Sequence, residues 1–203
     1  MSSPSPSVPS VQPGEIALLF DIADASISRG LRGEKPNAAD VSALPRGLQE
    51  KAGVFVTLTV SGALNGCMGS VEAAEPLGSA VARLAWSAAF ADPRLPVLAP
   101  PDYADLNIEI SILSPLAIVV AESRGELLGR VRPGVDGLLI TAGSKRAVFL
   151  PSVWDQIPDP EDFLDRLQQK AGMVPGTWPE GIRAARFIVT KHRRSAGGGS
   201  VAG

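Results

Sequence analysis

The most regular alternation of apolar and polar residues lies at residues 54–71. Its first half alternates in steps of two, as in a strand with one buried face, through Val54, Val56, Leu58 and Val60 and the intervening Phe55, Thr57 and Thr59. Ser61-Gly62 then predicts a turn, so residues 63–71 are expected to form the return strand of a hairpin. Asn65-Gly66 is also a hairpin-turn signal, but a turn there would leave Ser61-Gly62 inside a strand. We therefore prefer the turn at Ser61-Gly62.

Three other segments show the three- and four-residue apolar spacing of amphipathic helices. These helices are predicted at residues 14–29, 75–92 and 159–172. In the third, Asp159-Pro160 supplies an N-cap followed by proline at the first helical position, and Gly172 is a natural C-terminal stop. The sequence thus predicts helices on either side of the hairpin and a further one near the C-terminus.

Additional strands are expected where short apolar runs alternate with polar residues or flank a turn. They are predicted at Leu106–Leu113, at 135–140 and 147–150 as a second hairpin, at 183–190 and, less clearly, at 116–120. Gly143-Ser144-Lys145 partly matches a phosphate-binding loop, but that motif needs Gly-Lys-Ser/Thr at a strand-to-helix turn, and here a strand follows. A phosphate loop is therefore excluded. Trp178 is expected to fill part of the core.

Both ends of the chain are predicted to lie outside the folded part, which should span residues 14–190. Residues 1–13 are rich in serine and proline, a composition typical of a disordered leader. Residues 191–203 start with Lys191-His192-Arg193-Arg194 and continue into a glycine-rich run, which predicts a flexible tail. Contact of the basic stretch with an acidic partner is the alternative to a solvated terminus.

Composition and charge narrow the class of protein. The 203 residues are 45% hydrophobic and 20% charged, enough for one sizeable core in a single domain or two small lobes. A formal net charge of -2 provides no general attraction to nucleic acid or to an anionic membrane. The single cysteine excludes an internal disulfide, and no apolar stretch is long enough to span a membrane. The cytoplasm is therefore the expected location.

Cys67 is the most distinctive candidate for chemistry. Gly66 and Gly69 stand on either side of Cys67-Met68, and glycines inside a strand mark a bulge or a close approach to the backbone. The single histidine, His192, lies in the basic stretch. With one cysteine and one histidine, the chain is not expected to contain a Cys/His zinc site or a histidine-assisted nucleophile. No metal site is predicted. A free cysteine is also commonly a small buried core residue, and that alternative stays open.

A second candidate is the segment Asp92-Pro93-Arg94-Leu95-Pro96. Its two prolines hold the backbone extended and so fix the directions in which Asp92 and Arg94 point. These two residues are candidates for a site. A charge pair in a loop at the end of a helix is the simpler interpretation, because such ion pairs are common.

A third candidate is the polar face of the strand at residues 106–113, which carries Asn107, Glu109 and Ser111. If this face lies against the hairpin, the Glu109 carboxylate, the Ser111 hydroxyl and the Cys67 thiol share one cleft. If it is solvated, these are ordinary exposed residues, because antiparallel sheets commonly have one open face.

Five motifs occur in the order and spacing found in the AMMECR family, and the resemblance runs from about Gly14 to Thr190. They are Gly53-Val54-Phe55-Val56-Thr57-Leu58, Leu64-Asn65-Gly66-Cys67-Met68-Gly69, Asp92-Pro93-Arg94-Leu95-Pro96, Ile110-Ser111-Ile112-Leu113-Ser114 and Phe149-Leu150-Pro151-Ser152-Val153-Trp154. The family hallmark is usually Leu-Arg-Gly-Cys-Ile-Gly. Here Asn65 stands in place of the arginine and Met68 in place of the isoleucine. The change at Asn65 removes a fixed positive charge and a bidentate donor beside Cys67.

The resemblance implies an α+β (mixed α/β) fold in two lobes, built on antiparallel sheets flanked by helices, with the Gly-Cys hairpin lining a cleft. It implies neither an established activity nor a particular cofactor. Bacterial and archaeal members of the family include protein A of the AmmeMemoRadiSam system. By resemblance, the expected partners are a Memo-like protein and a radical S-adenosylmethionine protein.

Two functions are compatible with these features. In an enzyme or accessory subunit, Cys67 would be the reactive thiol, Glu109 the acid/base and Arg94 the group that holds an anion. Substrate contacts are then expected at Asn65, Gly66, Gly69, Asp92 and Ser111. The weakness of this hypothesis is the missing histidine, because an unassisted thiol is largely protonated at neutral pH. The alternative is a non-catalytic module that binds a small ligand or a peptide, with Cys67 as a structural core residue.

Overall fold

The computed structural model of the chain describes residues 8–36, 41–195 and 201–202. Most of the predicted leader, and residues 196–200 and 203 of the predicted tail, lie outside the described residues. The chain divides into two compact units. One consists mainly of Ser114–Val189, and the other contains Pro9–Leu113 together with the segment from Thr190 onward.

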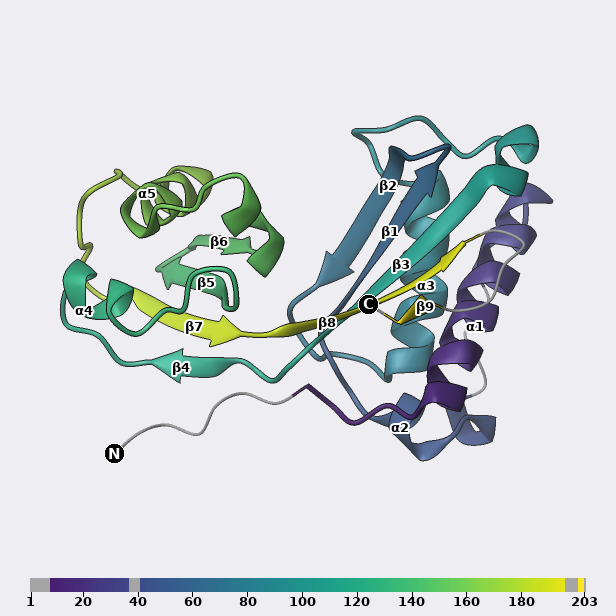
Figure 1. Ribbon diagram of the computed structural model, residues 1–203, viewed down its shortest axis with the longest axis horizontal. Helices are drawn as coiled ribbons and strands as arrows, with labels where there is room; N and C mark the ends of the chain where they lie inside the picture. Colours follow the sequence, from purple (N-terminus) through teal and green to yellow (C-terminus); the bar gives the residue numbers. More distant parts are fainter. Residues whose placement is uncertain (1–7, 37–40, 196–200, 203) are drawn as a thin grey trace. The chain divides into compact units, whose positions relative to one another are not determined.

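The larger unit is built on a five-stranded sheet in the order β2-β1-β3-β8-β9. Its strands are β1 (Val54–Val60), β2 (Ala63–Ser70), β3 (Leu106–Leu113), β8 (Val189–Ser195) and β9 (Val201–Ala202). Helices α1 (Pro13–Leu31) and α3 (Leu77–Phe90) pack against each other and cover one face of the sheet (Figure 1). The alternating apolar residues of β1 and β3 are buried beneath these helices, except Val60 at the end of β1, which is half-buried, so the predicted pattern is confirmed.

The turn between β1 and β2 confirms the preferred hairpin register. Ser61 has φ 50° and Gly62 has φ 83°, the left-handed pair that matches the twist of a two-residue hairpin. Leu58 pairs with Gly66 and Thr59 pairs with Leu64, so Asn65 is the extra residue of a bulge in β2. From Gly66 onward the ladder is regular, and Thr57 lies directly opposite Cys67.

The helices of this unit lie within about two residues of their predicted limits. α1 continues to Leu31, and α3 spans Leu77–Phe90, ending just before the proline-fixed segment that starts at Asp92. The Ser26 hydroxyl of α1 donates a 2.6 Å hydrogen bond to the carbonyl of Ala82 in α3, because both groups are buried and need partners. The connections contain η1 (Val41–Ala43), α2 (Arg46–Gln49) and η2 (Pro100–Asp105).

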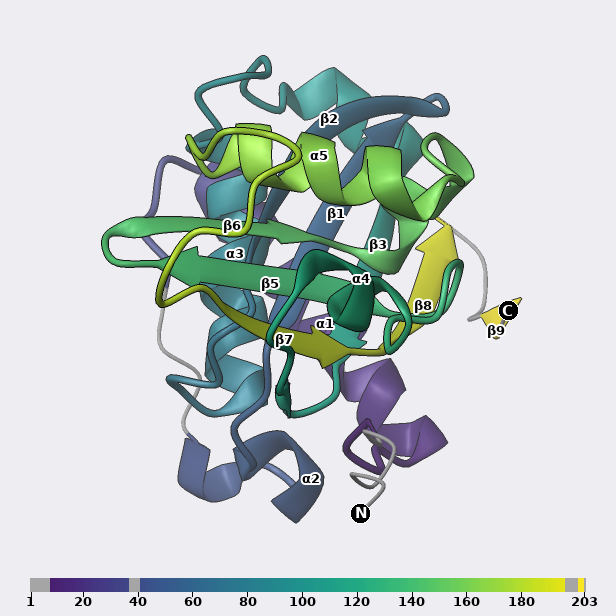
Figure 2. The same ribbon diagram turned by 90° about the vertical axis from the view of Figure 1, so that its left-hand side faces the viewer.

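The smaller unit is a four-stranded sheet in the order β4-β7-β5-β6. Its elements are β4 (Ala117–Val119), α4 (Arg124–Leu128), β5 (Gly137–Ala142), β6 (Lys145–Phe149), η3 (Pro151–Asp155), α5 (Pro160–Lys170) and β7 (Arg183–Phe187). Figure 2 faces this sheet, with α5 alongside β6. As predicted, the Asp159 carboxylate caps α5 by accepting hydrogen bonds from the amides of Glu161 and Asp162.

Trp178 is partly buried against the core of the smaller unit, as expected, and the fully buried tryptophan of that core is Trp154, which is 3% exposed and stacks on Phe163. One prediction about the C-terminal part needs correction. The predicted strand at 183–190 is two strands: β7 ends at Phe187, and β8 continues through Arg194 beside β3. Lys191–Arg194 therefore belong to a sheet, whereas the sequence predicts a flexible basic tail. The strand partner lies far away in the chain, so local composition does not reveal it.

Candidate functional site

Cys67 lies on the face of the five-stranded sheet opposite α1 and α3, which we call the thiol face. Thr57 of β1 is its cross-strand partner, and the Thr57 hydroxyl donates a 3.4 Å hydrogen bond to the Cys67 sulfur. The cysteine is half-buried. Its thiol is thus neither a fully buried core group nor freely exposed.

Glu109 lies on the same face, on the other side of Thr57. Thr57 pairs with Cys67 in β2 and with Glu109 in β3, so the three side chains form a row across three neighbouring strands. Neighbouring strands are about 4.8 Å apart, so the backbones of Cys67 and Glu109 are roughly 10 Å apart. A small molecule above Thr57 would lie next to both side chains.

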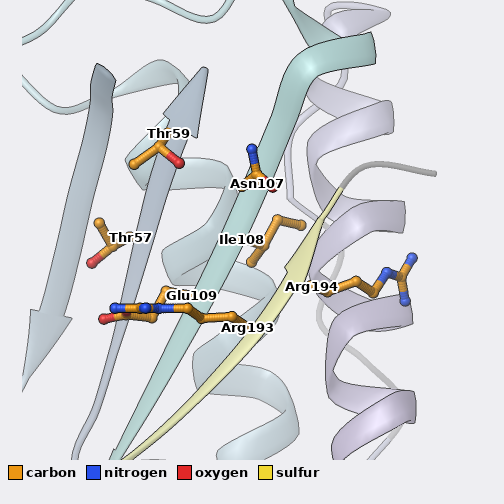
Figure 3. Close-up of a pocket in the computed structure, with 7 residues that line it drawn as sticks. All are labelled: Thr57, Thr59, Asn107, Ile108, Glu109, Arg193 and Arg194. Carbon is orange, nitrogen blue, oxygen red and sulfur yellow. The ribbon is translucent and has the colours of Figure 1, made fainter. Parts of the chain in front are cut away.

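The Glu109 carboxylate is surrounded by cations and a hydroxyl. Arg193 Nε lies 2.6 Å from one of its oxygens, and Lys191 Nζ lies 3.7 Å from the other. Ser111 donates a 3.3 Å hydrogen bond to the same carboxylate. Figure 3 shows the Arg193 guanidinium beside Glu109, whereas the Arg194 side chain points toward α1. Arg194 accordingly pairs with Asp21 of α1 at 2.6 Å.

A pocket of about 280 Å³ opens above this part of the sheet. It is lined by Thr57, Thr59, Asn107, Ile108, Glu109, Arg193 and Arg194 (Figure 3). Three strands contribute to it. Its lining combines threonine hydroxyls, an asparagine amide, charged side chains and one apolar side chain, that of Ile108. Cys67 is not among the lining residues, so a cleft at the Gly-Cys hairpin itself remains a prediction.

Asp92 and Arg94 contact the main chain of Cys67. The Asp92 carboxylate accepts a 3.0 Å hydrogen bond from the Cys67 amide, and Arg94 Nη2 donates a 2.7 Å hydrogen bond to the Cys67 carbonyl. Arg94 also binds Asp92 through Nε at 2.8 Å and Nη2 at 2.7 Å. β2 is the edge strand of the sheet, so its outward amide and carbonyl groups have no neighbouring strand to bind. At Cys67, the Asp92 and Arg94 side chains bind these groups instead.

Burial and charge make Asp92 the anchor of this arrangement. Its side chain is 2% exposed, whereas that of Arg94 is 65% exposed. Hydrogen bonds from the Arg94 guanidinium and from the Cys67 amide hold the pKa of Asp92 well below its ordinary value. The same pairing raises the pKa of Arg94. Asp92 is therefore an ionised group that positions the backbone at Cys67.

The two glycines beside Cys67 are explained by close packing. A Cβ atom at Gly66 would overlap the carbonyl oxygen of Ala88 in α3, and one at Gly69 would overlap the ring of Phe55. Asn65, the bulged residue, is 8% exposed and its amide donates a 3.5 Å hydrogen bond to the carbonyl of Pro96. Its side-chain oxygen is buried without a hydrogen-bond partner among the described residues.

The structure thus divides the residues singled out from the sequence into two groups. Cys67, Glu109 and Ser111 share the thiol face, although Ser111 is 2% exposed. The other group, engaged in packing or in the main chain at the edge of β2, comprises Asn65, Gly66, Gly69, Asp92 and Arg94.

The sequence interpretation gave no site role to four residues near Glu109. Thr57, Thr59 and Arg193 line the pocket, and Lys191 lies 3.7 Å from the Glu109 carboxylate. The threonines had a signal, since they alternate with apolar residues as Asn107 does on the polar face of the next strand. Lys191 and Arg193 had no signal except their charge. Among the described residues, no group of three or more His, Cys, Asp or Glu side chains is placed to hold a metal ion.

Comparisons with known proteins agree on the family. A sequence model of the AMMECR1 family matches residues 20–192. A protein of Methanothermobacter thermautotrophicus is 39% identical over 176 residues, covering 83% of this chain and 88% of the relative. Protein MJ0810 of Methanocaldococcus jannaschii is 35% identical over 155 residues, covering 72% of this chain and 75% of the relative.

The fold has a counterpart among solved structures. The crystal structure of the uncharacterized protein PH0010 from Pyrococcus horikoshii is 27% identical and superposes with a TM-score of 0.84, covering 95% of this chain and 98% of the other. This similarity supports the mixed α+β fold with two antiparallel sheets flanked by helices. None of the described helices is long and apolar enough to cross a membrane. From the sequence match and these relatives together, the chain belongs to the AMMECR1 family.

Proposed function

We propose that the protein is an enzyme or an accessory subunit whose small substrate binds on the thiol face, between Cys67 and Glu109. The single observation that carries this proposal is the register of β1 with both neighbours, which places Thr57 between the thiol and the carboxylate. Cys67 is the reactive thiol and Glu109 the acid/base at the other end of the substrate. Their backbones are roughly 10 Å apart, so a molecule above Thr57 can contact both side chains.

Three other residues hold the thiol in place. Thr57 orients the sulfur through its hydroxyl, and Asp92 and Arg94 bind the amide and the carbonyl of Cys67. Arg94 therefore acts in this proposal as a positioning residue, although its exposed guanidinium can also contact an anionic substrate. Ser111 supports Glu109, whereas Asn65, Gly66 and Gly69 shape the backbone of β2.

The experiment that tests this function is recovery of bound small molecules from the full chain purified from its native cells. Wild type, Cys67→Ser, Glu109→Gln and the control Glu180→Gln, an exposed carboxylate of the smaller unit, are compared by mass spectrometry. We expect one small molecule to accompany wild type and the control, to be bound in a different amount by Glu109→Gln, and to be recovered unconverted from Cys67→Ser. The same molecule at equal occupancy in all four proteins would contradict a site on the thiol face.

A second candidate is a binding module without catalysis. It is favoured by one observation: the side-chain hydrogen bond to the Cys67 sulfur among the described residues comes from Thr57, a hydroxyl and not a base. In that case Glu109→Gln changes the amount of bound ligand, and Cys67→Ser carries the same ligand in the same chemical form as wild type. Rapid modification of Cys67 by iodoacetamide in native buffer would instead favour the reactive thiol.

Partners and location are part of the same proposal. The family resemblance supports a Memo-like protein and a radical S-adenosylmethionine protein as partners, and the single cysteine supports the cytoplasm. Co-purification from native cells tests the partners directly. Recovery of neither protein under mild conditions, at expression levels where all three are present, would contradict this part of the proposal.

A further inference from the structure

The thiol face carries more positive than negative charge around the pocket. Lys191 and Arg193 are two residues apart on β8, and both lie within 4 Å of the same carboxylate, that of Glu109. One carboxylate neutralises one of these two cations and leaves a net charge of about one positive unit. The Arg193 side chain is 71% exposed, so part of its guanidinium remains available to a ligand. Arg194 does not add to this charge, because it pairs with Asp21 of α1.

Apart from Ile108, the remaining lining residues are neutral and polar. The hydroxyls of Thr57 and Thr59 lie on β1, and the amide of Asn107 lies on β3, two residues from Glu109 (Figure 3). They can bind hydroxyl or carbonyl groups of a ligand whose charged end lies at Arg193. The volume of about 280 Å³ is near the lower end of the range of ligand pockets, roughly 300–1,000 Å³, which indicates a small molecule.

We propose that this pocket binds a small hydroxylated anion, with its carboxylate or phosphate group on Arg193 and its hydroxyl groups on Thr57, Thr59 and Asn107, while Lys191 beside Glu109 adds positive charge. An arginine fork binds either oxyanion through two parallel hydrogen bonds. The inference rests on the proposed function in using the thiol face as the substrate site. It adds the chemical class of the ligand, and it does not require Cys67 to react.

The ligand competes with Glu109 for Arg193. Arg193 Nε now donates to a Glu109 oxygen at 2.6 Å, and an anion that takes this fork leaves the carboxylate with Lys191 and Ser111. Removing the Glu109 charge should therefore strengthen anion binding, and removing the Arg193 charge should weaken it. Opposite effects of two neighbouring variants distinguish this site from general attraction to positive charge.

The experiment titrates the full-length protein with two probes, inorganic phosphate and malate, at neutral pH and low, matched ionic strength. Amide NMR shifts of Thr57, Thr59 and Asn107 report binding in wild type, Arg193→Gln, Lys191→Gln and Glu109→Gln. The matched control is Arg166→Gln, since Arg166 is an exposed arginine on α5 of the smaller unit. The two probes show whether a phosphate or a carboxylate is preferred.

We expect Arg193→Gln to weaken binding of the preferred probe about tenfold and Glu109→Gln to strengthen it roughly threefold. Lys191→Gln should weaken it less than Arg193→Gln, and Arg166→Gln should leave it unchanged. Equal weakening by Arg193→Gln and Arg166→Gln, or no shift at these three amides with either probe, would overturn the inference. Cys67→Ser should keep the anion, so an unreactive Cys67 contradicts only the proposed catalytic function.

Discussion

The buried carboxylate of Asp92 accepts a hydrogen bond from the main-chain amide of Cys67, at 3.0 Å, across the outer edge of β2. Arg94 completes the contact by donating to the carbonyl of the same residue at 2.7 Å. The side chains of this proline-fixed loop thus take the place of a neighbouring strand at one residue. The backbone that carries the thiol is held from outside the sheet, while Thr57 holds the thiol itself from within it.

Asp92→Asn should destabilise the protein at neutral pH by about 1–3 kcal/mol, because a charge-assisted acceptor of several hydrogen bonds becomes a weaker one. The pKa of Asp92 is lowered in the folded state, so its contribution is complete above the ordinary aspartate pKa and is lost as pH falls toward the folded value. The difference between wild type and variant should therefore shrink below about pH 4.

Urea unfolding of both proteins across the acidic range measures this difference. The control is Asp155→Asn, an exposed aspartate of η3, for which we expect little change at neutral pH. A stability gap between wild type and Asp92→Asn that stays constant down to the lowest accessible pH would contradict the assigned ionisation.

Gly66→Ala should destabilise by about 3 kcal/mol or more, because its Cβ would overlap a backbone oxygen of α3 that cannot move independently. Gly14→Ala, in the first turn of α1, is the matched control: its Cβ meets open space, and alanine favours the helix by about 0.5–1 kcal/mol. Thermal unfolding of the two variants should shift in opposite directions. Similar melting temperatures of the two variants would contradict the close packing of β2 against α3 at Gly66.

Cys67→Ser and Cys67→Ala should each change stability by no more than about 1 kcal/mol, because the side chain is half-buried and a serine hydroxyl keeps Thr57 as its partner. Wild type should react with iodoacetamide in native buffer faster than it unfolds globally. Thr57→Val should alter that rate, because it removes the donor to the sulfur. Labelling no faster than global unfolding would show that Cys67 is a structural core residue and not an accessible thiol.

Deleting residues 191–203 should lower the melting temperature by roughly 5–10 °C, because it removes most of β8 and the partners of Glu109 and Asp21. Deleting Met1–Val11 is the comparison. That segment has too little apolar content to join a core, so we expect almost no change. Scanning calorimetry of the two truncations measures both effects, and equal melting temperatures would argue that β8 contributes no stability.

The sequence by itself determined the elements whose causes are local. The alternation of residues 54–60 and the turn at Ser61-Gly62 defined the hairpin, because strand periodicity and left-handed turn conformations depend on neighbouring residues. The cap at Asp159 and the limits of β3 were predicted for the same reason. The resemblance of its motifs to the AMMECR family predicted the architecture of antiparallel sheets in two lobes.

Tertiary structure decided the site. Thr57 joins Cys67 to Glu109 only because β1 pairs with β3 in one particular register, and no local pattern specifies the partner or the register of a distant strand. The sequence predicts one strand at 183–190 and a flexible tail after it, yet the strand divides near Ile188, whose amide donates a 3.0 Å hydrogen bond to the Ser114 hydroxyl, and β8 continues to Ser195. Because β8 pairs in the larger sheet, Arg193 lies beside Glu109. This pairing depends on contacts between segments that are far apart in the chain.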